Sequence, residues 1–303
     1  MAPSTQLTVG GLVTAERKLS VTNLVKTFPG GRGGGVVAID GIDLHVDSGE
    51  LVCIVGASGC GKSTLLNIVG GLEQHTSGEV EIDGEPVIGP GPDRGMVFQS
   101  YSLYPWKTVA QNVSFGLECA RTPKAGRRDR VDELLAIMGL AEFADHRPAE
   151  LSGGMRQRVA IARALAPEPD VLLLDEPFGA LDAQTKKSMQ DFLLTVWRRT
   201  GSTILMVTHD VEESIYLSQR IYVLTSRPGR VGAVVDVPFG RDRGPLVKRD
   251  PRFLDLRDEI EDLLLAPHDG GLAAAVATPA THHSSQSETH VRHRYDPRGP
   301  RPR

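Results

Sequence analysis

Apolar and polar residues alternate in the first part of the chain in the way that partly exposed β-strands require. The alternation runs through Leu19–Val25 and again through Ile42–Val46, which predicts antiparallel strands with one buried face. Residues 79–88 continue the pattern, with a tight turn at Asp83-Gly84. The first part of the ordered chain is therefore expected to form an antiparallel sheet.

A second kind of strand is apolar throughout. Leu51–Val55 and Val171–Leu174 carry no charged residue, and such runs are typical of parallel strands covered on both faces. Met96–Gln99 and Thr203–Val207 are predicted to be two further short strands. Because helical segments alternate with these runs, we expect an α/β fold.

Between the apolar runs, hydrophobic residues recur at helical spacing. They are Leu65, Ile68, Val69 and Leu72 in one helix, Val131, Leu134, Leu135 and Met138 in another, and Met155, Val159, Ala162 and Leu165 in a third. Thr108 and Gln111 form a capping box that opens a further helix, and Gly139 ends the helix that contains Val131 and Met138. Residues from about 100 to 160 are thus interpreted as a helical insertion.

The two ends of the chain are expected to contribute less to the core. Residues 1–17 are polar and rich in small side chains, which predicts a flexible N-terminus. Residues 232–239 suggest a strand, and apolar residues within 253–264 suggest a short helix that packs on the domain. From residue 266 onward Ala, Ser, His, Pro and Arg dominate, so residues 266–303 are predicted to be a disordered tail.

Composition excludes several classes of protein. With 34 basic and 38 acidic residues among 303, the chain lacks the basic surplus of proteins that bind phosphate backbones, so no nucleic acid partner is expected. No stretch reaches the ~20 apolar residues that cross a bilayer, so any work at a membrane is expected from outside it. The three cysteines are too scattered for a disulfide framework or a zinc site; two are expected to be buried and the third, Cys60, lies in a loop.

The loop that contains Cys60 matches G-x-x-x-x-G-K-S/T over Gly56–Ser63, between a predicted strand and a predicted helix. Its glycines let several backbone N–H groups converge on a phosphate. Lys62 adds a positive charge for the β- and γ-phosphates, and the Ser63 hydroxyl can ligate Mg²⁺. The alternative is a glycine-rich turn before a core helix.

A second helix start also suits an anion. Ser152-Gly153-Gly154 opens the helix that contains Val159, so bare backbone N–H groups and a serine hydroxyl lie together at its N-terminus. One chain with two such sites needs either two phosphates or a partner.

Two carboxylates follow the apolar run Val171–Leu174. Asp175 and Glu176 lie at the carboxyl end of that strand, the edge where open α/β sheets bind ligands, and their side chains are expected to point in different directions. His209 follows the strand Thr203–Val207 and is expected at the same edge. The alternatives are a solvated acidic pair and a structural histidine.

Aromatic residues stand out in two places. Phe28 lies upstream of the phosphate loop, where it can stack on adenine or belong to the core. The loop after Gln99 crowds Tyr101, Tyr104 and Trp106 around a proline, which indicates a contact surface, with packing under the next helix as the alternative.

Together these residues resemble the ATP-binding cassette (ABC) ATPases over about Leu19 to Arg230. The motifs occur in the family order: phosphate loop Gly56–Ser63, glutamine loop Gln99, signature Leu151–Gln157, Walker B Leu172–Glu176, D-loop Ala180–Asp182 and switch histidine His209. The phosphate loop fits many NTPases, whereas the signature is specific. The resemblance implies an α/β P-loop NTPase cassette over residues 18–265, with a RecA-like core, an antiparallel β subdomain and a helical insertion subdomain.

The resemblance also implies roles for single residues. ATP is expected to be held by Phe28, Gly56, Ala57, Ser58, Gly59, Cys60, Gly61, Lys62, Ser63 and Thr64. The signature residues Ser152, Gly153, Gly154 and Gln157 would face the ATP of a partner, and Asp182 would lie in the D-loop. Ser63, Gln99 and Asp175 would surround Mg²⁺. Glu176, His209 and Lys62 are expected to be the catalytic residues.

Partners follow from the same resemblance. The expected assembly is a homodimer, or a pair with a second ABC ATPase, on transmembrane permease subunits at the cytoplasmic face of the cell membrane. The loop Leu103–Trp106 and the segment Ser226–Arg230 look like importer ATPases of the nitrate, sulfonate and taurine group, which implies an extracytoplasmic solute-binding protein as well. Alternatives are an ABC exporter or lipid transporter, and a soluble ABC ATPase without a permease.

Overall fold

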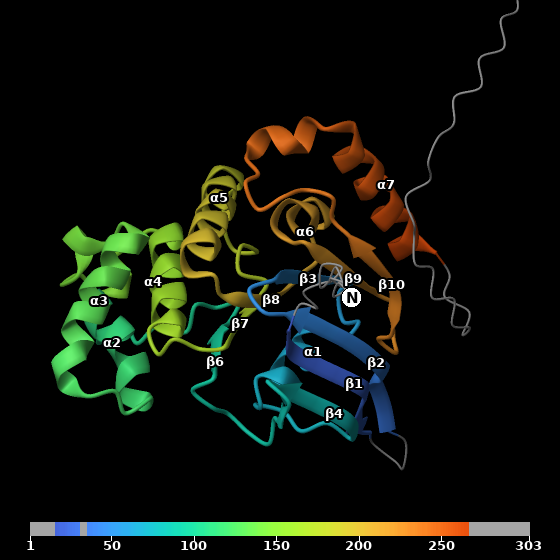
Figure 1. Cartoon of the computed structure of the whole chain (residues 1–303), viewed down its shortest axis with the longest axis horizontal. Coiled ribbons are helices and arrows are strands. Elements are labelled where there is room, and N and C mark those ends of the chain that lie inside the picture. The colour runs from blue at the N-terminus through green and yellow to red at the C-terminus, as the bar shows by residue number, and fades with distance from the viewer. Residues whose placement is uncertain (1–15, 31–34, 267–303) are drawn as a thin grey trace, which may run out of the picture.

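The computed structural model describes residues 16–30 and 35–266, which form two β-sheets and two groups of helices (Figure 1). The first sheet is antiparallel in the order β2-β1-β4-β5. Its strands are β1 (Arg17–Pro29), β2 (Gly35–Asp47), β4 (Ser77–Ile82) and β5 (Glu85–Pro86). The predicted turn is confirmed, because Asp83 and Gly84 both have positive φ, at 51° and 78°.

The second sheet has the order β10-β9-β3-β8-β7-β6, and all its neighbouring strands are parallel except β9 and β10. Its strands are β3 (Leu51–Gly56), β6 (Arg94–Val97), β7 (Val171–Asp175), β8 (Thr203–Thr208), β9 (Arg220–Leu224) and β10 (Val231–Asp236). Because β8 lies between β3 and β7, the carboxyl ends of these three strands meet at one edge. The loops that follow them therefore come together.

The second sheet is covered on both faces, which explains its apolar strands. Val52, Ile54 and Leu173 face a core cluster shared with β1, β2, β4 and helix α1 (Lys62–Val69). Their neighbours Cys53 and Leu172 face a larger cluster shared with the other helices. The predicted helix after the phosphate loop is shorter than expected: it ends at Val69, and Leu72 lies beyond it with 49% of its surface exposed.

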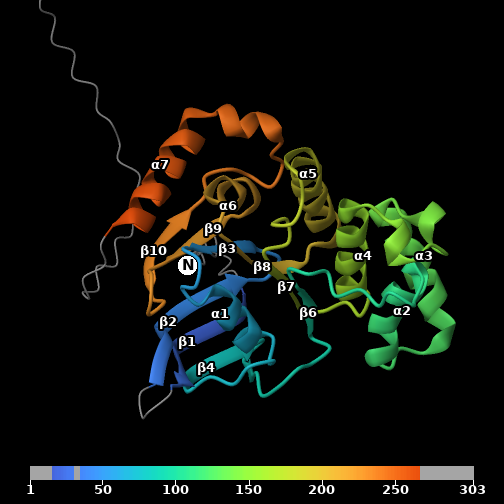
Figure 2. The ribbon, with the colours of Figure 1, turned by 180° about the vertical axis from the view of Figure 1, so that it is seen from behind.

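The helical insertion lies beside the core, at the end opposite helix α7 in both views (Figures 1 and 2). It comprises α2 (Val109–Cys119), α3 (Lys124–Met138), two short 3₁₀ turns (Ala141–Phe143 and Pro148–Glu150) and α4 (Gly153–Leu165). The capping box of Thr108 and the helix end at Gly139, with φ 64°, are both confirmed.

The remaining helices cover the larger core cluster. They are α5 (Ala183–Thr200), α6 (Val211–Leu217), a 3₁₀ turn (Pro245–Arg249) and α7 (Pro251–Leu265). The predicted C-terminal helix is α7, and it buries Phe253 and Ile260. Within the described residues no helix combines the length and the apolarity that a bilayer span requires. Of the flexible N-terminus predicted over residues 1–17, residues 1–15 lie outside the described residues, and the prediction was wrong at Arg17, which already begins β1. The tail predicted over residues 266–303 lies outside the described residues from residue 267 onward.

The cysteine expectation was wrong in part. Cys53 is buried, but Cys119 is exposed, and the loop residue Cys60 is buried instead. Burial raises the pKa of the Cys60 thiol above its ordinary value. Cys60 therefore packs in the phosphate loop as a neutral thiol.

Candidate functional site

The phosphate loop connects β3 to α1 and is folded as its glycines allow. Gly59 and Gly61 have φ values of 77° and 108°, a region that other residues rarely enter. The Lys62 side chain is only 5% exposed, and its Nζ donates to the backbone oxygens of Gly56, at 2.8 Å, and Ala57, at 3.1 Å. The ammonium is thus held against the loop in which a phosphate would lie.

The carboxylate after β7 reaches the phosphate loop. Ser63 Oγ lies 3.0 Å from Asp175 Oδ1 and donates to it. Burial raises the pKa of Asp175, and the neighbouring charge of Glu176 adds to the shift although the Ser63 hydrogen bond opposes it. A cation between these two oxygens would offset the cost of burying the charged Asp175 carboxylate.

This oxygen pair fits Mg²⁺, which prefers carboxylate and hydroxyl oxygens and keeps several waters. Gln99, the third expected ligand, is exposed, and its Nε2 lies near Gly179, as does Glu176 Oε2. The described residues contain no cluster of three or more His, Cys, Asp or Glu side chains that could hold a metal. A Mg²⁺ ion here would therefore depend on water and phosphate oxygens for the rest of its shell.

Glu176 and His209 lie together at the same sheet edge. Glu176 Oε2 is 2.9 Å from His209 Nδ1, and the Glu176 N–H donates to Val207 O on β8 at 3.0 Å. The Glu176 backbone has φ 43°, which turns its side chain away from that of Asp175. One carboxylate therefore pairs with Ser63 and the other with His209, as the sequence predicts from their different directions.

Further contacts fix the residues around His209. Asp210 caps α6 by accepting from Glu213 N at 2.9 Å, and it also accepts from Lys186 Nζ at 2.7 Å. Asp182 caps α5 by accepting from Thr185 N at 3.0 Å, a hydrogen bond that lowers the pKa of this carboxyl. The D-loop and the histidine loop are therefore tied to each other through α5.

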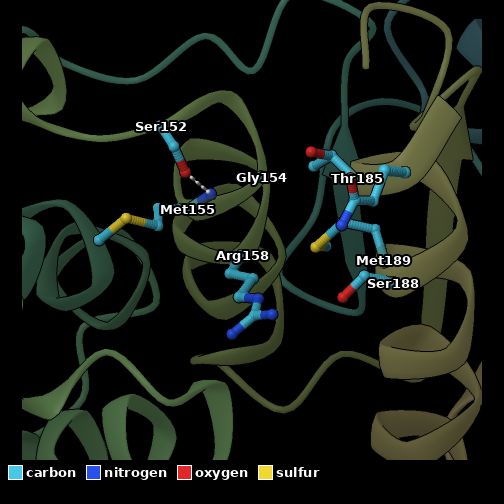
Figure 3. Close-up of a pocket in the computed structure, with 8 residues that line it drawn as sticks. Ser152, Gly154, Met155, Arg158, Thr185, Ser188 and Met189 are labelled. Atoms are coloured by element: carbon cyan, nitrogen blue, oxygen red, sulfur yellow. Dashed lines mark hydrogen bonds between the residues drawn. The ribbon is translucent and has the colours of Figure 1, made fainter. Parts of the chain in front are cut away.

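The signature lies at the start of α4. Ser152 is exposed and caps the helix by accepting from Met155 N at 3.3 Å, whereas Gly154 is buried (Figure 3). A groove of about 310 Å³ separates this helix start from α5. Its lining residues are Ser152, Gly154, Met155, Arg158, Gln184, Thr185, Ser188 and Met189. The helix start thus faces open space on one side.

Gln157 differs from its expected place. Its side chain is 0% exposed, and both amide atoms are buried without a hydrogen-bond partner in the structure. Gln157 comes one helical turn after Gly153, where the helix surface already faces the core. In this conformation its side chain therefore does not face outward toward a second chain, unlike that of Ser152.

Phe28 lies at the end of β1 and belongs to neither core cluster among the described residues. Its ring has Lys26 Nζ 4.6 Å from the centroid, and it pairs with Val36 on β2. The core interpretation of Phe28 is therefore not supported: the ring is half-buried, and Lys26 lies over it.

The aromatic loop is fixed at its base and exposed at its tip. Tyr104 packs on Phe115, with ring centroids 4.6 Å apart, and its backbone oxygen and nitrogen both bond to Asn112. Arg163 on α4 holds the Tyr101 and Ser102 oxygens. Trp106 is 68% exposed. The sequence did not single out Asn112 or Arg163, because these two polar residues carry no motif of their own.

Comparisons with known proteins agree with this geometry. Residues 39–179 match the ABC transporter family. A nitrate import ATP-binding protein from Synechocystis sp. is 51% identical over 252 residues, which cover 81% of this chain and 94% of that protein. A bicarbonate transport ATP-binding protein from Synechococcus elongatus is 46% identical over 246 residues, covering 80% of this chain and 37% of that longer protein.

Solved structures with the same fold are ABC cassettes. The dimeric ATP-binding cassette MJ0796, in a post-hydrolysis state bound to ADP and Pi, has a TM-score of 0.63 and 35% identity over 73% of this chain and all of that one. CbiO1 from Clostridium perfringens, part of an ABC transporter complex, has a TM-score of 0.64 and 31% identity over 73% of this chain and 89% of that one. The predicted fold class is confirmed. The chain belongs to the ABC transporter family, as one of its ATP-binding, ATP-hydrolysing proteins.

Proposed function

We propose that this ATPase is the energy-coupling subunit of an importer for a small oxyanion of the nitrate class. The observation that carries the proposal is the 51% identity to a nitrate import protein across nearly all of that protein's length. The relative that transports bicarbonate, another small oxyanion, supports the same class of solute. The partners would be transmembrane permease subunits, at whose cytoplasmic face the chain would sit, and an extracytoplasmic solute-binding protein.

The working unit would be a head-to-tail pair of cassettes. The phosphate loop and the signature helix start belong to different parts of one chain, and Ser152 is exposed. In a pair, each ATP would lie between Gly56–Thr64 of one chain and Ser152–Gly154 of the other. The MJ0796 cassettes, at 35% identity, are dimeric, which supports pairing of this chain.

ATP would then act as the link between the chains. Binding of its γ-phosphate across the interface would close the pair, and hydrolysis would reopen it. Each charge-assisted hydrogen bond lost is worth roughly 1.5–3 kcal/mol, so several lost together shift a two-state equilibrium strongly.

Hydrolysis would depend on the pair at the sheet edge. Glu176 would take the proton of the attacking water or orient that water, and His209, 2.9 Å from it, would hold this carboxylate and the γ-phosphate in register. Lys62 would stabilise charge on the transferred phosphoryl group. Ser63, Asp175 and Gln99 would hold Mg²⁺, which when bound neutralises charge on the β- and γ-phosphates.

The permease would contact the aromatic loop. Trp106 exposes 68% of its surface on a loop whose base is fixed by Asn112 and Arg163. Exposed aromatics on a rigid base are enriched in protein interfaces. Tyr101, Tyr104 and Trp106 would form part of a groove for a short cytoplasmic helix of the permease.

Uptake by reconstituted vesicles tests the proposal. Vesicles that contain the native permease, the solute-binding protein and this ATPase are expected to take up nitrate in preference to taurine and alkanesulfonates, and only with ATP. Equal or greater uptake of the sulfonates would contradict the nitrate class, and outward transport would contradict import.

Trp106→Ala provides a matched variant for the same vesicles. The isolated ATPase should hydrolyse ATP at the wild-type rate, because Trp106 is 68% exposed and its ring packs on Tyr104 of the same loop. Uptake should fall about tenfold or more, the loss typical of an interface hot spot. Crosslinks from the permease to the opposite face of the cassette would refute the proposed contact.

A further inference from the structure

The segment Ser226–Arg230 connects β9 to β10 and lies against the phosphate loop. A Cβ placed on Gly229 would come within 2.2 Å of the Cys60 backbone oxygen, so only glycine fits where these two backbones meet. On its other side Gly229 bonds to β2, donating to Ala38 O at 2.9 Å and accepting from Asp40 N at 3.0 Å. The segment is thus fixed between the antiparallel sheet and the phosphate loop.

Within this segment Arg227 contacts the loop directly. Its Nε donates to Gly59 O at 3.0 Å, and a Cβ on Gly59 would lie 3.0 Å from Arg227 Nη2. Arg230 has a similar exposed position but pairs with Asp40, with Nε 3.0 Å from Asp40 Oδ2. Of these two arginines, only Arg227 has a contact with the phosphate loop among the described residues.

The bonded oxygen belongs to a peptide unit that matters for phosphate binding. In a trans peptide the C=O and N–H groups point in opposite directions, so holding Gly59 O also fixes the direction of the Cys60 N–H. That N–H points to Ala57 O inside the loop, at 3.3 Å, a distance at the long end for a hydrogen bond. A phosphate oxygen in the loop could take it over at little cost.

We propose that Arg227 is a positioning residue for nucleotide binding, which holds the Gly59–Cys60 peptide in the orientation that receives a phosphate. Gly59 has a left-handed backbone and no side chain, so the peptide that follows it has few steric restraints of its own. Among the described residues, Arg227 is the side chain that donates to Gly59 O. The charged donor on Gly59 O supplies that restraint from outside the loop. The proposal concerns the loop alone and holds whichever solute is transported.

Steady-state hydrolysis by the full chain tests it. Arg227→Ala is expected to raise the KM for ATP about three- to tenfold, the size expected for the net loss of one hydrogen bond made by an exposed side chain, with kcat within about twofold. Arg227→Lys, which keeps a charged donor, should restore more than half of the loss. Arg230→Ala, the matched control in the same segment, should leave KM unchanged. A normal KM for Arg227→Ala, or a fall in kcat alone, would overturn the proposal.

Calorimetric binding of ATP and ADP separates positioning from direct contact. A loop held in the wrong orientation should bind both nucleotides equally poorly, since both carry the β-phosphate that the loop cradles. Weakened binding of ATP with normal binding of ADP would instead mean that Arg227 touches the γ-phosphate, and would overturn the positioning role. If Arg227→Ala fails to fold, the same two titrations on Arg227→Gln decide the question.

Discussion

The phosphate loop and the signature helix start both suit a phosphate, but they are built in opposite ways. Around the phosphate loop, contacts join distant parts of the chain, such as Ser63 with Asp175 and Arg227 with Gly59. At the signature, Ser152 bonds to its own helix and borders an open groove. We call the phosphate loop with Asp175, Glu176 and His209 the prepared region, because contacts within one chain hold its residues in place. We call the start of α4 at Ser152–Gly154 the open region, because its donors border a groove that a ligand from outside the chain can enter. Changes in the first should therefore affect the nucleotide bound to the same chain, and changes in the second the nucleotide bound to the partner.

The largest expected effect is that of Glu176→Gln, in the prepared region. The amide cannot accept a proton from water, so hydrolysis should fall by about 10²–10⁴, the usual contribution of a general base, with ATP affinity retained. The closed pair should then accumulate and elute as a dimer with ATP and magnesium. Phosphate release and gel filtration measure the two results.

Glu212→Gln is the control for that experiment, because it makes the same chemical change at an exposed carboxylate on α6. It should hydrolyse ATP at the wild-type rate. Wild-type turnover by the Glu176 variant would remove the assignment of Glu176 as the base.

Ser152→Ala tests the signature region and should have a smaller effect. Loss of one hydrogen bond to a charged phosphate predicts hydrolysis about 10- to 100-fold slower, while nucleotide binding to the single chain stays normal. Ser152→Thr keeps the hydroxyl and the cap and should retain most activity. Ser188→Ala, in the same groove, should be neutral.

Mixing two inactive variants tests whether the signature acts on the partner's nucleotide. A pair made of one Ser152→Ala chain and one Glu176→Gln chain contains one intact site only if Ser152 acts across the interface. Mixed chains should then hydrolyse ATP faster than either variant alone. Absence of any recovery, with pairs present, would mean that both residues serve the same chain's site.

The sequence predicted the prepared region well because its signals are local. A run such as Leu51–Val55, a glycine loop and a helical stripe can each be recognised without knowledge of the fold. Strand order then brings Asp175, Glu176 and His209 to one edge of the sheet. The sequence already indicated this position, because each of these polar residues comes at or just after the end of an apolar strand. The Glu176–His209 contact of 2.9 Å needed coordinates.

Other features had no local signal. Strand β9 and helix α6, within residues 211–224, were not predicted. A buried glutamate, Glu213, interrupts the apolar residues there. The apolar runs are too short for periodicity to distinguish a helix from a strand. The length of α1 was overestimated because the apolar stripe continues to Leu72 past the cap at Gly70. Arg227 reaches Gly59 across 168 residues, a contact that only tertiary structure reveals.

Gln157→Leu has the smallest expected effect on hydrolysis and addresses where the signature's functional surface ends. Leucine has a similar size, and it removes two buried amide atoms that lack partners, so the free energy of unfolding should rise by about 1 kcal/mol and Tm by roughly 2–4 °C. Because the side chain is 0% exposed, hydrolysis should stay within about twofold of wild type. A more than tenfold loss of hydrolysis in a chain that unfolds at the wild-type Tm would mean that Gln157 turns outward in the closed pair. The open region would then extend one helical turn beyond Gly154, and pairing would rearrange the start of α4.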